Sequence, residues 1–160
     1  MIITENKFSR RVILRGAGTV ALVGLGTTAF GRPAVAANDK YPAEAFKQQK
    51  DADAIRLLYG KRAEASDKIK LDAPEIAENG AVVPVSVTTT LADVSSISFL
   101  VAENPNVLIA SYRIPAGTVP AVANRIKMAK TSKVTVLVEA GGKLYSADKE
   151  VKVTVGGCGG

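Results

Sequence analysis

Residues 134–155 read VTVLVEAGGKLYSADKEVKVTV, and this stretch decides the fold. Two β-rich runs, 134–139 and 143–147, flank the pair Gly141-Gly142, and a glycine pair between such runs is typical of a β-hairpin. A third run, 151–155, alternates valine with lysine or threonine, which is the two-residue period of a strand. The stretch therefore predicts a hairpin followed by a final strand.

The residues that precede this hairpin repeat the pattern, with short β-rich runs separated by turn residues. The turn Asn104-Pro105-Asn106 separates two of these runs, and Pro84 near the start of another indicates an edge or a bulge. The expected strands are 69–71, 82–90, 97–103, 107–114 and 121–129. Residues 67–155 thus predict an all-β core, an immunoglobulin-like antiparallel β-sandwich of about seven strands. A small barrel is the alternative fold.

Residues 38–66 predict an N-terminal α-helical segment in front of the sandwich. Pro42 lies near its beginning, where a helix tolerates proline, and Gly60 is a suitable stop. Apolar residues such as Phe46 and Tyr59 are mixed with charged ones, so one side of the helix can be apolar. Because that side is thin, we expect the helix to pack against the sandwich or against a partner.

Residues 1–37 have the composition of an export signal. The pair Arg10-Arg11 precedes an apolar stretch, 16–30, and a run of small residues, 33–37, follows. This order is that of a signal peptide, and the adjacent arginines favour the twin-arginine route to the periplasm. A membrane-spanning helix needs about 20 apolar residues, and this stretch is shorter and contains glycines. We expect cleavage after Ala36 or Ala37, with no membrane span left in the mature chain.

The composition of the chain excludes several classes of function. There is no histidine and only one cysteine, so intramolecular disulfides, His/Cys metal sites and His-dependent catalytic triads cannot be built. The net charge of +6 comes largely from the first 37 residues, and the rest of the chain has a net charge of only +2. This near-neutral remainder lacks the basic, aromatic-rich face typical of nucleic-acid binding. We therefore expect no metal, no cofactor and no nucleic-acid partner.

The chain ends in a glycine-rich arm, residues 156–160, with Cys158 at its centre. Gly156, Gly157, Gly159 and Gly160 surround the only cysteine of the chain. Glycine adds backbone freedom and no bulk, and five extended residues reach at most about 18 Å. A thiol on such an arm can enter a narrow cleft of another protein. The pattern predicts a tether whose sulfur carries adducts between the active sites of client enzymes.

Several other readings of the arm remain open. Cys158 could be incidental to a frayed tail, because chain termini are commonly disordered. A lone secreted cysteine often pairs with another chain, which would make this a structural subunit with a fixed intermolecular disulfide. The terminal Gly159-Gly160 could instead be loaded as a thiocarboxylate, but that chemistry consumes ATP and the export signal counts against it. A prenylation box does not fit, because Cys158 is third from the end.

The chain resembles the SoxY family, the substrate-carrying subunits of the periplasmic thiosulfate-oxidising Sox system. The resemblance rests on the leader, on the run PEIAENGAVVPV at 74–85, on the Glu103-Asn104-Pro105 turn and above all on VKVTVGGCGG at 151–160. It implies that Cys158 is the covalent attachment point for thiosulfate-derived sulfur and that the chain is a carrier and no enzyme. It also implies a heterodimer with a SoxZ-like subunit. The transient clients would be a c-type haem enzyme that conjugates thiosulfate and a hydrolase that releases sulfate.

Four basic residues of the later strands raise a weaker hypothesis of a docking patch for such clients. They are Arg113, Arg125, Lys127 and Lys130. Basic residues on strand faces are usually solvated surface, so the pattern alone does not favour docking over solvation.

Overall fold

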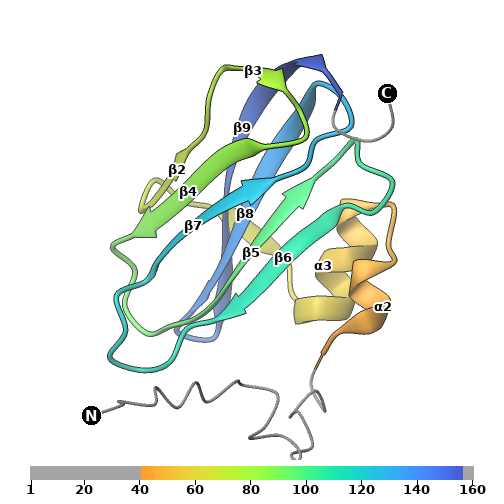
Figure 1. The fold of residues 1–160 in the computed structure, drawn as a ribbon. Helices are drawn as coiled ribbons and strands as arrows, with labels where there is room; N and C mark the ends of the chain where they lie inside the picture. Colours follow the sequence, from red (N-terminus) through yellow and green to blue (C-terminus); the bar gives the residue numbers. More distant parts are fainter. Residues whose placement is uncertain (1–40, 157–160) are drawn as a thin grey trace, which may run out of the picture. The chain divides into compact units, whose positions relative to one another are not determined.

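The computed structural model describes residues 41–156, which form two short helices and nine strands (Figure 1). The helices are α2 (Ala43–Phe46) and α3 (Asp51–Tyr59). The strands are β1 (Ala63–Ala65), β2 (Ile69–Asp72), β3 (Ile76–Asn79), β4 (Val83–Thr89), β5 (Val94–Val101), β6 (Leu108–Arg113), β7 (Ala121–Ile126), β8 (Ser132–Ala140) and β9 (Lys143–Val155).

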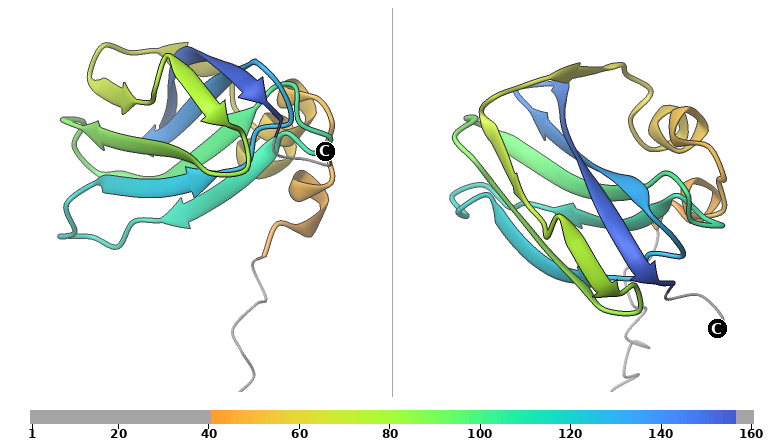
Figure 2. Two further views of the ribbon diagram at one scale, coloured as in Figure 1. Left: turned by 45° about the horizontal axis from the view of Figure 1, so that its top comes forward. Right: turned by 90° about the horizontal axis from the view of Figure 1, so that it is seen from above.

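The strands form the predicted sandwich of two sheets. The large sheet has the order β1-β9-β8-β5-β6, with β3 also paired to β9, and the small sheet has the order β2-β4-β7. In the right-hand view of Figure 2 the small sheet and the helices lie on opposite sides of the large sheet. The prediction of a mostly β, two-sheet fold with helical structure near its N-terminal end is confirmed.

The predicted hairpin is also confirmed, and its turn explains why two glycines are needed. Ala140 of β8 pairs with Lys143 of β9, so the loop contains only Gly141 and Gly142. Their φ angles are +55° and +77°. Two consecutive positive φ angles define the tight turn whose twist matches that of the flanking strands, and side chains other than that of glycine are disfavoured there.

Three details differ from the prediction. The runs 143–147 and 151–155 belong to one strand, β9, because the charged residues between them include no glycine or proline to break it. Two additional strands, β1 and β3, pair with β9 in parallel rather than antiparallel fashion. The helical segment predicted for 38–66 is divided into α2 and α3, because Lys50 is extended and the Gln48 carbonyl accepts a hydrogen bond from Val107 N–H instead of continuing a helix.

The main core lies between the two sheets. The inward-facing residues of β4 are Val83, Val85 and Val87, each at most 3% exposed. They face β5 and β8, which contribute the main apolar residues of the large sheet: Ile97, Phe99, Val134, Val136 and Val138. Burial of a side chain of this size contributes about 1.5–3 kcal/mol, so this layer supplies most of the stability of a chain that has no disulfide among its described residues.

A second core joins the helices to the other face of the large sheet. Leu100 of β5 and Leu137 of β8 point away from the sandwich and pack with Ala54 of α3. At the same interface the Tyr59 hydroxyl lies 2.7 Å from the hydroxyl of Ser98, which is fully buried. Burial is the main reason that the pKa of Tyr59 is raised. This polar contact fixes the end of α3 on the sheet.

Replacing Tyr59→Phe removes this hydroxyl and should lower the free energy of unfolding by about 1 kcal/mol, the usual net value of a hydrogen bond in a protein. Urea denaturation of the full chain measures the change in the free energy of unfolding. Tyr145→Phe is the matched control, because the Tyr145 hydroxyl has no hydrogen-bond partner among residues 41–156. Equal stability of the two variants would contradict the anchoring role of Tyr59.

Candidate functional site

Most of the residues singled out in the sequence lie outside the described part of the chain. These are Cys158, Gly157, Gly159 and Gly160 in the arm, and Arg10 and Arg11 in the leader. Gly156 is the first residue of the arm and the last residue that the structure describes. The structure therefore shows the place from which the cysteine-bearing arm leaves the sandwich.

This place, called the arm base below, consists of four segments at one end of the sandwich (Figure 1). They are the end of β9 with Gly156, the β3–β4 turn (80–82), the β7–β8 loop (127–131) and the β5–β6 turn (102–107). Hydrogen bonds between these segments connect parts of the chain that are far apart in the sequence. The arm thus leaves from a junction of several loops rather than from a free strand end.

The last residue of β9 is held by the β3–β4 turn. Val155 pairs with Asn79, and its carbonyl accepts a hydrogen bond of 2.7 Å from the N–H of Gly80. The carbonyl of the same Gly80 accepts a second hydrogen bond, also 2.7 Å, from Met128 N–H. Gly80 is buried, and its two hydrogen bonds connect the end of β9 to the β7–β8 loop.

The side chain of Asn104 fixes the β7–β8 loop from the other side. Asn104 is only 8% exposed. Its Nδ2 donates to the Lys127 carbonyl and its Oδ1 accepts from the Ala129 N–H, both at 2.8 Å. The predicted Asn104-Pro105-Asn106 turn between two strands is confirmed, but the sequence analysis did not find this role of its first side chain. The Lys127 carbonyl and the Ala129 N–H lie 23 and 25 residues away from Asn104, so no local pattern could have revealed it.

Gly156 lies directly against the loop that Asn104 holds. A Cβ atom at position 156 would overlap the carbonyl oxygen of Ala129 and come within 3.3 Å of its carbonyl carbon. No L side chain fits there unless the backbone moves. From the sequence, Gly156 was expected to contribute to arm flexibility. The structure adds a different reason for glycine at this position, because the backbone at 156 approaches the backbone at Ala129 too closely for a Cβ atom.

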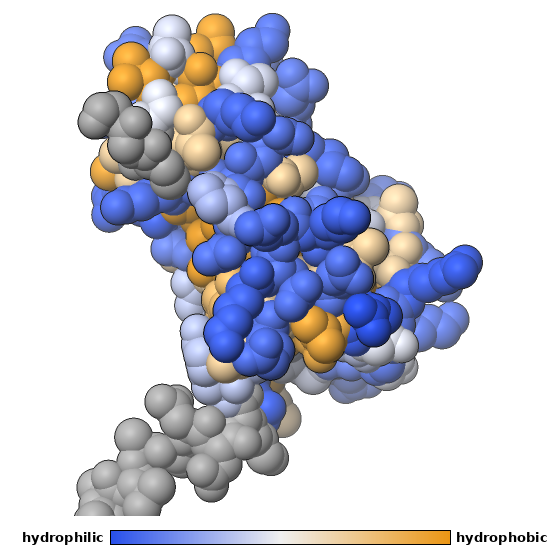
Figure 3. Space-filling model, turned by 90° about the vertical axis from the view of Figure 1, so that its right-hand side faces the viewer, coloured by the Kyte–Doolittle hydropathy of each residue, from blue (hydrophilic) through white to orange (hydrophobic). Residues whose placement is uncertain are grey.

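The surface around the arm base is partly apolar. Val155 is 64% exposed and Val82 in the β3–β4 turn is 54% exposed. Figure 3 shows hydrophobic residues on the upper part of this face of the molecule, the end at which β9 terminates. Charged residues also lie near the arm base, and Lys127 among them is exposed. Lys130 lies 2.8 Å from the carboxylate of Glu103, and burial is the main cause of the raised pKa of Asp51.

The four basic residues of the docking hypothesis do not lie together. Lys127 and Lys130 are in the β7–β8 loop at the arm base, and Arg125 is near the end of β7. Arg113 ends β6, which runs away from the arm base before β7 returns to it. Lys130 is in addition paired with Glu103. A single patch of all four residues is therefore excluded by the topology.

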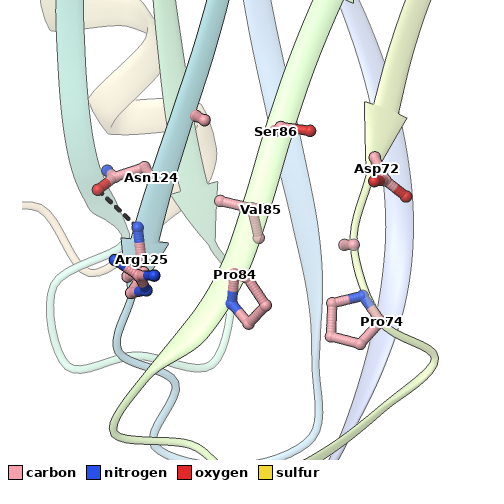
Figure 4. A pocket seen from close by; sticks show the side chains of 9 residues that line it. Asp72, Pro74, Pro84, Val85, Ser86, Asn124 and Arg125 are labelled. Atoms are coloured by element: carbon pink, nitrogen blue, oxygen red, sulfur yellow. Dashed lines mark hydrogen bonds between the residues drawn. The ribbon is translucent and has the colours of Figure 1, made fainter.

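The outer face of the small sheet carries a shallow depression of about 630 Å³ (Figure 4). Pro74, Pro84 and Arg125 lie along it, and the backbone N–H of Arg125 donates to the Asn124 side chain. Residues 41–156 contain no group of three His, Cys, Asp or Glu side chains that could hold a metal ion. In the same part of the chain no helix has the length and apolar character required to cross a membrane.

Comparison with known proteins identifies relatives. The model of the sulfur oxidation protein SoxY family matches residues 55–158. The solved structure of the sulfur carrier protein SoxY from Chlorobium limicola f thiosulfatophilum is 44% identical, covers 66% of this chain and 97% of its own, and superimposes with a TM-score of 0.61. A superoxide reductase (neelaredoxin) from Ignicoccus hospitalis is 19% identical over 54% of this chain and 80% of its own, with a TM-score of 0.48. No curated protein matches the chain.

Replacing Asn104→Ala should destabilise the domain by about 1–3 kcal/mol, because it leaves the Lys127 carbonyl and the Ala129 N–H, which meet Asn104 in a partly buried contact, without their partners. Thermal or urea unfolding of the full chain measures the loss. Asn106→Ala, an exposed residue of the same turn, is the matched control and should change stability by less than about 0.5 kcal/mol. A loss no larger than that of the control would contradict the observed hydrogen bonds.

Proposed function

This chain belongs to the SoxY family of sulfur oxidation proteins, and we propose that it carries the sulfur intermediates of thiosulfate oxidation covalently on Cys158. One observation carries the proposal. The family match extends to residue 158, the only cysteine of the chain, and this cysteine is flanked on each side by a glycine pair. The related structure is itself described as a sulfur carrier protein.

The chemistry requires a thiol and two client enzymes. In the loading step the Cys158 thiol and thiosulfate form an S–S bond, one proton is released, and two electrons pass, one at a time, through the haem of the conjugating enzyme to an electron-accepting protein. The product is a cysteine S-thiosulfonate. In the unloading step the hydrolase cleaves the terminal S–S bond with water. The sulfonate group takes the hydroxyl of the water and leaves as hydrogen sulfate, and the sulfur that remains on Cys158 takes the other proton as a persulfide. In each step the carrier contributes only its cysteine sulfur and brings the bound intermediate to the client's active site.

The described part of the chain suits this division of work. Within residues 41–156 there is no candidate metal cluster, and the chain as a whole has no histidine. General acid–base and redox groups would then come from the clients. Covalent attachment keeps the intermediate at a high effective concentration near each active site in turn, which a free sulfur species would not achieve.

A SoxZ-like subunit is the proposed stable partner. In the described residues β6 ends the large sheet on one side, and β2 and β7 are the outer strands of the small sheet. Edge strands expose unpaired N–H and C=O groups that favour pairing with or covering by another chain. We place the complex in the periplasm, to which the leader with Arg10 and Arg11 directs the chain by the twin-arginine route.

Intact mass spectra of the chain from cells grown with and without thiosulfate test the proposal. We expect adducts of sulfur or thiosulfonate that appear with thiosulfate, disappear on mild reduction and map to Cys158. Cys158→Ser should lose every adduct and all thiosulfate-dependent sulfate release, while its unfolding temperature stays that of the wild type, because the buried core of the described residues is built from residues between 45 and 151.

Two results would contradict the carrier role. An unmodified thiol under both growth conditions would indicate an incidental cysteine. A single stable disulfide to one partner, present with and without thiosulfate, would indicate a structural subunit instead.

A further inference from the structure

We propose that Asn104 is a positioning residue for the carrier arm, acting through the β7–β8 loop on Gly156. The inference rests on the proposed function of Cys158. It concerns the described residues of the arm base, and it assigns to Gly156 a role in fixing the arm in addition to any flexibility it confers.

Several contacts connect the segments of the arm base to one another. Asn104 binds the backbone of the β7–β8 loop at Lys127 and Ala129. Ala129 contacts Gly156 through its carbonyl group. The loop is also bonded through Met128 to Gly80, which in turn bonds Val155. The end of β9 is therefore bonded to the β3–β4 turn through Gly80 and to the β7–β8 loop through Thr131, and the buried Asn104 side chain bonds this loop in turn.

The second step is the chemistry of that side chain. The loop offers one carbonyl and one N–H, so the residue that fixes it needs a donor and an acceptor on a short side chain. A primary amide has both groups, whereas an aspartate has no donor and a leucine has neither. Because Asn104 is 8% exposed, water cannot easily replace the two hydrogen bonds if they are lost.

The third step is the short distance to the cargo. Cys158 is two residues beyond Gly156, and two extended residues span at most about 7 Å. The position and direction of Gly156 therefore determine most of the volume that the sulfur can reach. If the base loosens, the arm departs over a wider range of directions, and a smaller fraction of encounters presents the sulfur correctly to a client.

Amide hydrogen exchange of the full chain, followed by NMR, tests the contacts without any client. Asn104→Ala and Gly156→Ala should each accelerate exchange at Gly80 and Met128 at least tenfold relative to the wild type. The amides of β5 and β8 in the main core should change far less. Asn106→Ala and Gly157→Ala are the matched controls and should leave Gly80 and Met128 unchanged. If the two glycine variants behave alike, Gly156 acts only by flexibility and the inference is overturned.

Loading by the thiosulfate-conjugating haem enzyme tests the positioning itself. In Asn104→Ala we expect KM for the carrier to rise about threefold to tenfold with kcat nearly unchanged, because apparent affinity falls with the fraction of competent conformers. A purely structural role would accelerate exchange and leave KM unaltered, which would overturn the inference. If Asn104→Ala does not fold, Asn104→Asp serves instead. It keeps the acceptor for Ala129 N–H, loses the donor to Lys127, and should give a smaller rise in KM.

The wild-type chain separates the two proposals. If it gains no adduct from thiosulfate and the haem enzyme, the carrier function fails and the positioning role falls with it. If the wild-type chain is loaded and the Asn104 and Gly156 variants are loaded with the same KM, the carrier function stands and only the positioning role is wrong.

Discussion

The structure depends on the pairing of one strand, β9, along both of its edges. On one edge β8 pairs with it from Lys143 to Val151. On the other edge β1 pairs with its beginning and β3 with its end, up to Val155. Residues 144–146 are paired on both edges and residues 152–155 are paired with β3, so the strand cannot peel away without breaking a ladder. The chain thus continues into its cysteine-bearing arm from an element whose pairing extends to Val155.

The same sheet also explains the unusual density of apolar residues in β5 and β8. Five consecutive residues of each strand are buried, at 97–101 and 134–138, because the small sheet covers one face and the helices cover the other. Strands of this kind lose the alternation of a half-exposed sheet. By contrast β4, which is covered on one face only, keeps its alternating pattern of buried valines and exposed polar residues.

The sequence permitted prediction of whatever depends on near neighbours. The hairpin at Gly141-Gly142, the turn at Asn104 and the two-sheet core all follow from local spacing. The short strands β1 and β3 were missed because Ala63–Ala65 has no strand-like pattern and its partner, Leu144–Ser146, lies 81 residues further along the chain. The roles of Asn104 and Gly156 were hidden for the same reason, since each depends on the β7–β8 loop. The resemblance of 151–160 to a family identified the cysteine, but it did not reveal how the arm is mounted.

The parallel partners of β9 have a consequence for the order of folding. Segments before residue 80 complete the edge of the last strand, so the ladder at the arm base closes a loop of about 75 residues between β3 and β9. Contacts of such long separation form late, because the entropy of loop closure must be offset by structure that already exists. A chain that is only partly folded therefore lacks the pairing of β3 with the end of β9, the strand that precedes the cysteine-bearing arm. The ladder that ends at Val155 is then complete only when the whole domain has folded.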